Sequence, residues 1–383
     1  MPVLFLLLAL TASSVTEVDR EPTAESIERA IDSGVAYLLD HQEPDGAWGH
    51  WRRPLGSDNY SWTTPGTHYS WQVASTGIVC VTLMDLGARI DDRGEAALMR
   101  GLDFLCEKGR CKRIDTWDVD NMWGLLYGLE AAGRALAIED RLGEERARRL
   151  RSLAEDVVAM MRYHQSPDGG WAYYDDPPFM RRPSWGTSFV TAAVLLVFEQ
   201  LEKVGVEVPD IMQERGLRAL RTCRIPNGAY SYSVEAFPNP GRLDDIDRVK
   251  GSLCRIQVGN LALRICGENE VSDGDLEKGL EQFFRHHKFI SLARGRPFPH
   301  EAYYANSAYF FFFGHYYAIG NIQQLPAQKR AIWWPQLTAK VLRCQEADGS
   351  MWDYSMNSYF RIYGTGWGTS VLIHALREMP QRL

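Results

Sequence analysis

Two kinds of apolar segment alternate along the chain. In the first kind, apolar residues recur every three or four positions, the spacing of a helix with one buried face. These segments are 25–41, 149–164, 212–223 and 336–344. The second kind is apolar on nearly every side, as in helices that are buried all round. These segments are 71–87, 185–201, 251–267 and 366–379. The pattern therefore predicts helix pairs, each with a half-exposed outer helix followed by a buried inner helix.

A short turn motif separates the two helices of each pair. It reads QEPDGAWG at 42–49, QSPDGGWAY at 165–173, RIPNGAYSY at 224–232 and QEADGSMWDY at 345–354. The Asp-Gly or Asn-Gly core suits a turn, because glycine readily takes positive φ where a helix ends. The tetrapeptide WGTS also recurs, at 185–188 and 367–370. We interpret this recurrence as two inner helices in a common register.

The spacing of the motifs gives the number of repeats. Gln165 and Arg224 are 59 positions apart, whereas the intervals from Gln42 to Gln165 and from Arg224 to Gln345 are 123 and 121. Each long interval holds two repeats of about 60 residues, one of them with a degenerate motif. The additional helix pairs are 95–108 with 117–133, and 275–287 with 303–320.

Six helix hairpins predict an all-α protein with an (α/α)6 toroid, a double ring of six outer and six inner helices. An open solenoid would need polar capping repeats at its ends, and neither end of this chain has them. The ring would form a single domain over 21–383. Every turn motif, and the N-terminus of every inner helix, would then lie at one end of the ring, here called the mouth.

The first 20 residues have a different character. MPVLFLLLALTASS is a short apolar run followed by small residues, which is typical of a signal peptide, although no positive residue precedes the run. A signal peptide over 1–20 predicts export to the periplasm or the extracellular space; otherwise the protein would be cytoplasmic. Seven scattered cysteines form neither a disulfide framework nor a zinc pattern. In an exported chain, Cys106 and Cys111 could bridge a short loop.

The turn motif Gln-x-Pro-Asp-Gly-x-Trp resembles the repeats of squalene-hopene cyclases and protein prenyltransferase β subunits, and the resemblance covers the chain after the leader. It implies that motif residues such as Gln42, Trp48, Gln165 and Trp171 serve the fold. The prenyltransferases bind zinc through an Asp-x-Cys pair that opens an inner helix. Here Ser252 stands two residues before Cys254, so the resemblance implies no metal.

Class II terpene cyclases of this superfamily use an Asp-x-Asp-Asp motif at the start of a cavity-facing helix. Asp118-Val119-Asp120-Asn121 matches three of its four positions. The resemblance implies that Asp120 donates a proton and that Asp118 supports it, without a cofactor. Asn121 departs from the motif, and the chain has room for one helical domain where full-length cyclases carry two. Alternatively, Asp118 and Asp120 simply cap the N-terminus of an inner helix.

Carbocations formed in this way are stabilised by aromatic faces, each by about 0.5–2 kcal/mol. Candidate substrate-binding aromatic residues on the inner segments are Trp71, Trp123, Tyr127, Trp185, Tyr303, Tyr304 and Trp367. The expected ligand is an apolar isoprenoid, so we also expect peripheral contact with a membrane. The net charge of −7 argues against binding to nucleic acid. The pattern indicates no oligomeric state.

Two other functions remain open. An exported, non-catalytic toroid would bind a ligand or protein at its mouth. A secreted (α/α)6 enzyme that processes polysaccharides would use acids and exposed aromatic residues there, and Trp51, Tyr60 and Trp62 make the first loop rich in aromatic side chains.

Overall fold

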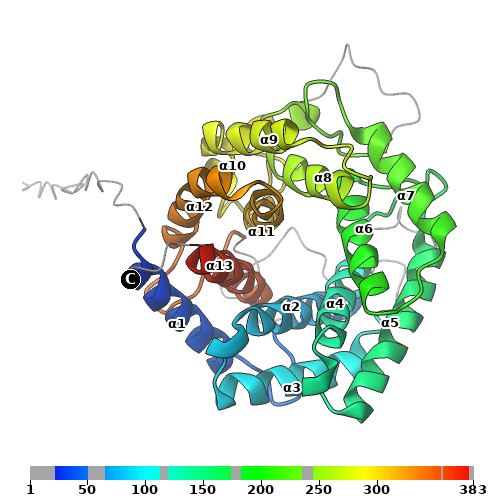
Figure 1. The fold of residues 1–383 in the computed structure, drawn as a ribbon, viewed down its shortest axis with the longest axis vertical. Coiled ribbons are helices and arrows are strands. Elements are labelled where there is room, and N and C mark those ends of the chain that lie inside the picture. Colours follow the sequence, from blue (N-terminus) through cyan, green and yellow to red (C-terminus); the bar gives the residue numbers. More distant parts are fainter. Residues whose placement is uncertain are drawn as a thin grey trace, which may run out of the picture.

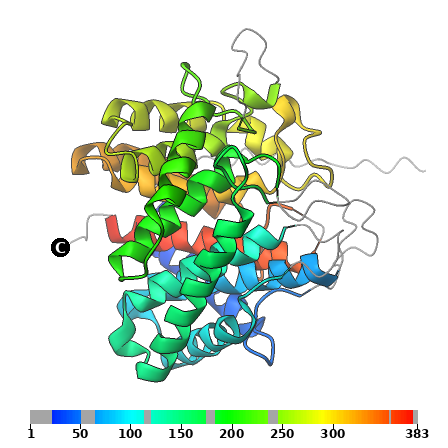
Figure 2. The same ribbon diagram turned by 90° about the vertical axis from the view of Figure 1, so that its right-hand side faces the viewer.

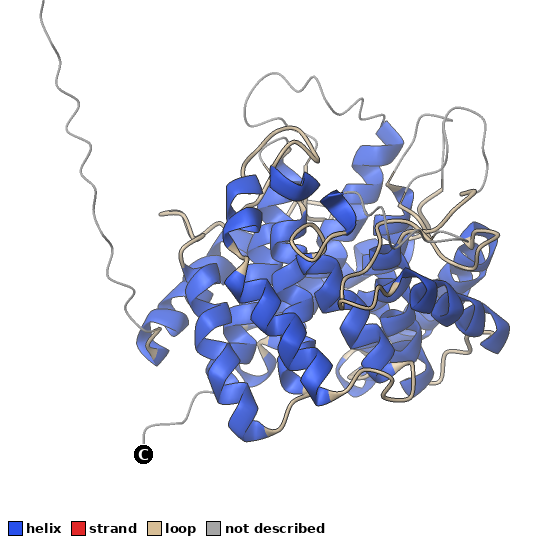
Figure 3. Cartoon of the chain, turned by 90° about the horizontal axis from the view of Figure 1, so that it is seen from above, coloured by secondary structure: helices blue, strands red, loops and turns tan. Residues whose placement is uncertain are grey.

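The computed structural model describes residues 22–50, 65–112, 120–173, 183–234, 245–354 and 357–378. These residues form thirteen α-helices and no strand, only isolated β-bridges at the turns (Figure 3). The outer helices are α1 (Ala24–Asp40), α3 (Asp92–Lys108), α5 (Glu144–His164), α7 (Asp210–Cys223), α9 (Asp273–Arg285) and α12 (Ala327–Leu342). The inner helices are α2 (Pro65–Asp85), α4 (Asn121–Leu136), α6 (Ser188–Lys203), α8 (Leu253–Ile265), α11 (Phe310–Gln323) and α13 (Ser358–Glu378). A short helix, α10 (Lys288–Ala293), lies between α9 and α11.

The inner helices form a closed ring. Helix α2 packs on α4, α4 on α6, α6 on α8, α8 on α11, α11 on α13, and α13 returns to α2 (Figure 1). The outer helices surround this ring, and both layers run between the same two ends of the molecule (Figure 2). The predicted (α/α)6 toroid is therefore confirmed.

The two kinds of sequence pattern correspond to the two layers. Helix α1 buries one face through Ile27, Ile31 and Leu38, which lie four and seven residues apart. Helix α11 instead buries four consecutive phenylalanines, from Phe310 to Phe313, because protein surrounds it on every side. Most of the helical stability comes from packing of these apolar faces.

The motif glutamines hold neighbouring repeats together. Gln42 Nε2 donates to the carbonyl oxygen of Gly46 in its own turn, at 3.0 Å, and to that of Ala97 in the next outer helix, at 2.8 Å. Gln165 repeats this arrangement with its own turn and with α7. Gln345, in the last repeat, donates to Ala30 of α1 at 2.8 Å. The motif glutamines are therefore confirmed as residues that serve the fold.

Glycine is required in these turns for two reasons. Gly46 and Gly169 have φ of 90° and 98°, which other residues rarely adopt. A Cβ atom on either would also lie 2.5 Å or 2.6 Å from a carbonyl oxygen of the next outer helix, that of Arg100 or Arg215. The turn thus brings the next outer helix closer than any side chain would permit.

Two expectations about the inner helices were wrong. Helix α13 begins at Ser358, before the predicted start at 366, because its glycines lie inside the helix at sites of close packing. A Cβ atom on Gly366 would lie 2.9 Å from the Ile78 side chain. The two WGTS sequences also do not share a register: Thr187 precedes α6, whereas Thr369 lies well inside α13.

Hydrogen bonds to the turns show the correct register of these two helices. Thr191 Oγ1 accepts from the backbone N–H of Trp171 at 3.0 Å, and Thr365 Oγ1 accepts from that of Met351 at 2.8 Å. Thr365 is therefore the counterpart of Thr191 in the last repeat.

The structure bears on some of the remaining expectations. All seven cysteines are free thiols, including Cys106 and Cys111. No helix within the described ranges is long and apolar enough to span a bilayer. The leader lies outside these ranges, so export stays a prediction.

Candidate functional site

Asp120 stands directly before α4 with an unusual backbone conformation. Its φ of 69° is left-handed, which costs roughly 1–3 kcal/mol in a residue other than glycine. Two backbone hydrogen bonds hold it there: its N–H donates to the carbonyl oxygen of Tyr173 at 2.9 Å, and its carbonyl oxygen accepts from the N–H of Trp123 at 3.0 Å. Its carboxylate makes no capping hydrogen bond to α4. Asp120 therefore occupies the N-cap position of α4, but its side chain does not cap the helix.

The carboxyl group of Asp120 has one neutral hydrogen-bond partner in the described structure. Trp71 Nε1 donates to its Oδ2 at 3.0 Å. Burial raises the pKa of Asp120 to about 6, and the Trp71 hydrogen bond opposes this rise only in part. At pH 7 roughly one molecule in ten would then carry the proton on Asp120. Asp118 lies outside the described residues.

Four of the predicted aromatic residues come together beside Asp120. Trp71 of α2 and Trp123 of α4 are stacked, with ring centroids 6.2 Å apart. Trp123 also stacks on Tyr127 at 5.9 Å, and Tyr127 meets the edge of Trp367 of α13 at 5.3 Å. Three inner helices therefore contribute to one continuous aromatic cluster.

Aromatic side chains also meet across the centre of the ring. Trp123 of α4 contacts Phe313 of α11, which lies on the opposite side, at 6.3 Å, and Phe313 contacts Trp367 at 6.2 Å. Trp123, Tyr127, Phe313 and Trp367, here called the aromatic floor, are at most 8% exposed. Trp71 and Asp120 keep partial exposure. The part of the site that solvent reaches therefore lies between the aromatic floor and the mouth.

The other three predicted aromatic residues lie elsewhere. Trp185 precedes α6 and is half-buried. Tyr303 and Tyr304 belong to a 3-10 helix, η4 (Tyr303–Ala305), and both pack on Phe289. Tyr303 is 69% exposed, and the hydroxyl of Tyr304 accepts from Lys250 Nζ at 3.2 Å. The structure thus does not bring Tyr303 and Tyr304 into the aromatic floor.

Three tyrosines near Asp120 were not among the predicted site residues. Tyr173, Tyr232 and Tyr309 are partly exposed at the mouth, and the hydroxyls of Tyr173 and Tyr232 are 2.6 Å apart. A signal for two of them exists in the repeats. Tyr173 and Tyr232 each stand eight positions after the first residue of their motif, Gln165 or Arg224. In these two repeats the aligned motifs therefore mark a position that faces the mouth.

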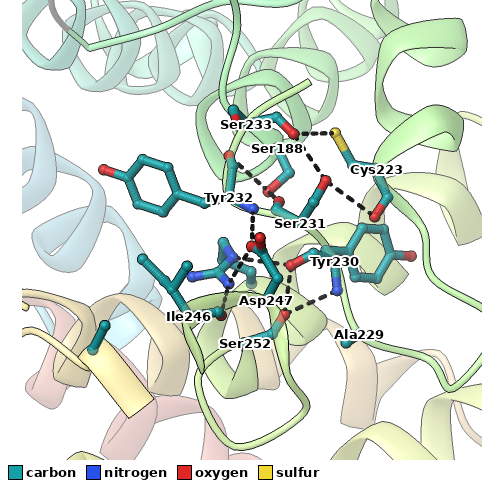
Figure 4. Close-up of polar contacts among 12 residues, drawn as sticks. Ser188, Cys223, Ala229, Tyr230, Ser231, Tyr232, Ser233, Ile246, Asp247 and Ser252 are labelled. Atoms are coloured by element: carbon teal, nitrogen blue, oxygen red, sulfur yellow. Dashed lines mark hydrogen bonds and ion pairs between the residues drawn. The ribbon is translucent and has the colours of Figure 1, made fainter. Parts of the chain in front are cut away.

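The backbone at Tyr232 is held by a buried polar cluster. Its N–H donates to Asp247 Oδ1 at 2.6 Å, and Asp247 lies 3.7 Å from the Arg255 guanidinium, which is itself buried. Figure 4 shows the phenol ring of Tyr232 pointing away from Asp247, and the Arg255 guanidinium lies 5.5 Å from the centroid of this ring. Ser252, the residue in place of a prenyltransferase aspartate, donates to the carbonyl oxygen of Tyr230 and accepts from its N–H, both at 2.9 Å. Ser252 therefore serves the turn.

A second buried acid occupies the equivalent position in the last repeat. Asp353 stands eight residues after Gln345, and burial raises its pKa to about 7. Its two oxygens accept from the Tyr363 hydroxyl at 2.8 Å and from the Phe312 N–H at 3.1 Å. Because these bonds tie α11 to α13, we interpret Asp353 as structural. The described ranges hold no group of three His, Cys, Asp or Glu residues placed to bind a metal ion.

No protein-family model matches the sequence, and no curated protein matches it significantly. Solved structures do match. An inactive variant of an α-1,6-mannanase from a Salegentibacter species, in complex with α-1,6-mannotriose, is 12% identical with a TM-score of 0.57, over 93% of this chain and 99% of that chain. A type II terpene cyclase from Scytonema, in complex with geranylgeranyl dihydroxybenzoate, is 15% identical with a TM-score of 0.52, over the same shares. A mannosidase from Bacteroides thetaiotaomicron is 11% identical with a TM-score of 0.54, over 92% of this chain and 98% of that chain.

The chain shares the toroid fold of these enzymes. At such low identity the likeness shows the fold alone. It confirms, at the level of fold, the resemblance to terpenoid-cyclase-like toroids. The solved cyclase is matched over nearly its whole chain by this single ring. The neighbours include both a terpene cyclase and mannan-processing enzymes. Any choice between these functions for this chain must therefore rest on its own residues.

Proposed function

We propose that this protein is an acid-initiated, class II isoprenoid cyclase with Asp120 as its proton donor. The observation that carries the proposal is the environment of the Asp120 carboxyl. It makes no cap, it accepts from a neutral indole, and burial raises its pKa to about 6. Enzymes keep a carboxylic acid protonated near neutral pH by such desolvation.

The proposed reaction uses this acid and the aromatic rings beside it. Asp120 gives its proton to one carbon of a terminal alkene or to an epoxide oxygen, which leaves a carbocation. Further double bonds of the isoprenoid then attack the cationic centre and close rings. The faces of Trp71 and Trp123 would stabilise the cation by about 0.5–2 kcal/mol each. Because the aromatic floor closes the ring below, the substrate would lie on the mouth side.

A polysaccharide-processing role fits these residues less well. Glycosidases generally use two carboxyl groups that flank the scissile bond, about 5–9.5 Å apart. Among the described residues no acid is a cause of the pKa shift of Asp120, which comes from burial and the Trp71 hydrogen bond, and Asp118 lies outside these residues. Asp353 has both oxygens engaged in bonds between helices.

The test compares the wild type with Asp120→Asn, which keeps the shape and removes the acid. Each protein is incubated with squalene and with linear isoprenoid diphosphates, and products are identified by mass spectrometry. We expect cyclic products from the wild type and a roughly 10²–10⁴-fold slower reaction with the variant, the usual contribution of a general acid. Asp140→Asn is the control because Asp140 is exposed, and it should match the wild type.

Parallel incubations with α-1,6-linked mannooligosaccharides separate the competing functions. Release of shorter sugars, with no isoprenoid product, would replace the cyclase by a glycosidase. Absence of product from every substrate would contradict an enzymatic role for these ligand classes and favour the non-catalytic binding function.

A further inference from the structure

A second polar region lies inside the ring at the end opposite the mouth, here called the far end. Its central residue is Glu130, which stands seven residues after Trp123 on α4 and therefore about 10 Å further from the mouth. Tyr316 of α11 donates its hydroxyl hydrogen to Glu130 Oε1 at 2.5 Å, and Gln200 of α6 donates to the Glu130 carbonyl oxygen at 3.1 Å. Three inner helices therefore meet at Glu130, below the aromatic floor.

Solvent reaches this region from the far end. Leu196 of α6 stands two helical turns after Phe189, whose ring contacts Trp123, so Leu196 also faces the interior of the ring. Leu196 and Tyr316 are both partly exposed, although protein surrounds the helices that carry them. Because the aromatic floor separates these side chains from the mouth, water enters the ring at the far end.

Glu130 is 9% exposed and has an oxygen without a partner. Oε1 accepts from Tyr316, whereas Oε2 makes no hydrogen bond or ion pair within the described ranges and is not closed off from solvent. The next cation on α4, Arg134, pairs with Asp85, and His374 of α13 also lies on Asp85. Glu130 is therefore the acid at the far end whose charge is not balanced by an ion pair among the described residues.

Aromatic rings lie beside the Glu130 carboxyl. The Tyr316 ring stacks on Trp367 with centroids 5.7 Å apart and meets the edge of Tyr317 at 5.2 Å. Tyr127 stands one turn before Glu130 on α4. Aromatic faces attract a positive charge, and sites for organic ammonium ions use this attraction. A single carboxylate supplies too few oxygen ligands for a calcium or magnesium ion.

We propose that the far end of the ring binds a small organic ammonium ion at Glu130, Tyr316 and Leu196, here called the far-end site. The ammonium group pairs with Glu130 Oε2 beside the Tyr316 ring, which Trp367 supports from behind. The apolar part of the ion packs on Leu196. The far-end site lies on the other side of the aromatic floor from Asp120, so it does not depend on the proposed cyclisation.

The first test needs no variant. Choline carries a quaternary ammonium group, and 3,3-dimethylbutan-1-ol has the same shape with an uncharged carbon in place of the nitrogen. Isothermal titration calorimetry of the wild type at pH 8 should show saturable binding of choline. The alcohol should bind at least about tenfold more weakly, because it lacks the charge. Equal affinities for the two compounds, or no saturation by about 10 mM choline, would overturn the proposal.

Substitutions then locate the bound ion. Glu130→Gln keeps an acceptor for the Tyr316 hydroxyl but removes the charge, so the affinity for choline should fall by about 10- to 100-fold. Tyr316→Leu removes the ring and should also weaken binding. Glu139→Gln is the matched control, because Glu139 is an exposed acid at the same end, and it should bind choline as the wild type does.

The variant Asp120→Asn distinguishes the far-end site from the mouth. It should bind choline with the affinity of the wild type, whether or not the protein is a cyclase. Loss of choline binding in Asp120→Asn, with binding retained in Glu130→Gln, would place the ion at the mouth and contradict the proposal.

The pH dependence of binding identifies the group that pairs with the ion. Burial raises the pKa of Glu130, and the Tyr316 hydrogen bond and the charge of Arg134 oppose this rise. The titratable groups that face Glu130 are Tyr127 and Arg134 on α4, Tyr316 and Tyr317 on α11, and Asp85 on α2.

A protonated Glu130 carries no charge, so an ammonium ion must displace its proton. The affinity of the wild type for choline should therefore fall as pH drops through the pKa of Glu130 and should level off above it. Glu130→Gln should lose this dependence. An equal fall of affinity with pH in the wild type and in Glu130→Gln would assign the dependence to another group and overturn the role of Glu130.

Discussion

Two aspartates at opposite ends of the inner ring have pKa values that are shifted in opposite directions. Asp85, at the end of α2, is 2% exposed and forms an ion pair with Arg134 of α4, and His374 Nε2 of α13 lies 3.4 Å from its Oδ2. Burial alone would raise the pKa of Asp85, but the hydrogen bond from His374 and the charge of Arg134 lower it overall. Asp120, at the mouth, has an indole instead of a cation, and its pKa rises to about 6.

The difference shows what decides the charge of a carboxyl group inside this ring. Asp85 is almost fully buried and gains the positively charged Arg134, whereas Asp120 keeps partial exposure and, among the described residues, contacts an indole. The paired carboxylate stays ionised and links α2, α4 and α13. The Asp120 carboxyl, which has no cation partner among the described residues, stays available to hold and release a proton. Pairing therefore separates a structural acid from a chemical one.

The largest expected stability effect breaks the pair at Asp85. Arg134→Met leaves the Asp85 carboxylate buried with His374 alone, and removing one partner of a buried pair typically costs about 3–5 kcal/mol. We expect the free energy of unfolding, measured with urea at pH 7, to fall by about 3 kcal/mol, the low end of this range, because His374 remains. Arg148→Met is the matched control: Arg148 pairs with Glu145 on the surface, and such pairs contribute at most about 1 kcal/mol. Equal losses in the two variants would contradict the comparison.

The next effect is the pH dependence of stability. The folded pKa of Asp120, about 6, lies above the unfolded value near 3.9. Protonated Asp120 therefore contributes stability that is present below pH 3.9 and is lost as pH rises through 6. Asp120→Asn removes this dependence. The free energy of unfolding of the variant, relative to that of the wild type, should therefore rise by up to about 3 kcal/mol between pH 3 and pH 8.

Asp85→Asn should show the opposite pH dependence. Its folded pKa is lowered, so the ionised pair contributes stability above the unfolded pKa, which is lost as pH falls through the folded value. The variant should be less stable than the wild type at pH 7, and the difference in stability should become smaller in acid. Parallel unfolding curves for Asp85→Asn and Asp120→Asn across pH would argue against the distinction between the two ends.

A smaller effect concerns the indole that contacts Asp120. Trp71→Phe removes a hydrogen bond worth roughly 1 kcal/mol, which favours the ionised carboxylate. The pKa of Asp120 should then rise further, by somewhat less than one unit. Carbon NMR of the aspartate carboxyls follows this titration. Trp367→Phe, a substitution within the aromatic floor, should leave the pKa of Asp120 unchanged. A shift of this pKa in Trp367→Phe but not in Trp71→Phe would assign the effect to packing.

The smallest effect is expected at Tyr303. Its side chain is 69% exposed and packs only on Phe289 among the described rings. Tyr303→Ala should change unfolding free energy by no more than about 0.5 kcal/mol and leave turnover unchanged. A large loss of turnover would support the prediction that Tyr303 binds substrate.

Local patterns in the sequence predict the ring well because each repeat carries its own helix periodicity and turn. The same reasoning failed where packing between repeats decides the outcome. Gly364, Gly366 and Gly368 look like a break, yet they lie within α13 because neighbouring atoms leave no room for a Cβ. The two WGTS tetrapeptides are alike only in sequence. The register of α6 and α13 depends on the hydrogen bonds that Thr191 and Thr365 accept from distant turns.

The candidate site was predictable only in part for the same reason. Asp120, Trp71, Trp123, Tyr127 and Trp367 follow from the acidic motif and the apolar inner segments. The left-handed backbone of Asp120 depends on a hydrogen bond to Tyr173, in the following repeat. The contact of His300 with Tyr309 depends on a loop with several left-handed residues, which no periodic pattern reveals.

The bond from Gln345 to Ala30 has a consequence for biosynthesis. Helix α1 packs so closely on α13 that a Cβ on Gly34 would lie 2.5 Å from Thr369 Oγ1. A ribosome makes α1 before α13, so the apolar face of α1 lacks its packing partner until α13 has emerged. We therefore expect the nascent chain to need protection at α1 until the ring closes, and expect a circular permutant that makes α13 directly before α1 to shorten that interval.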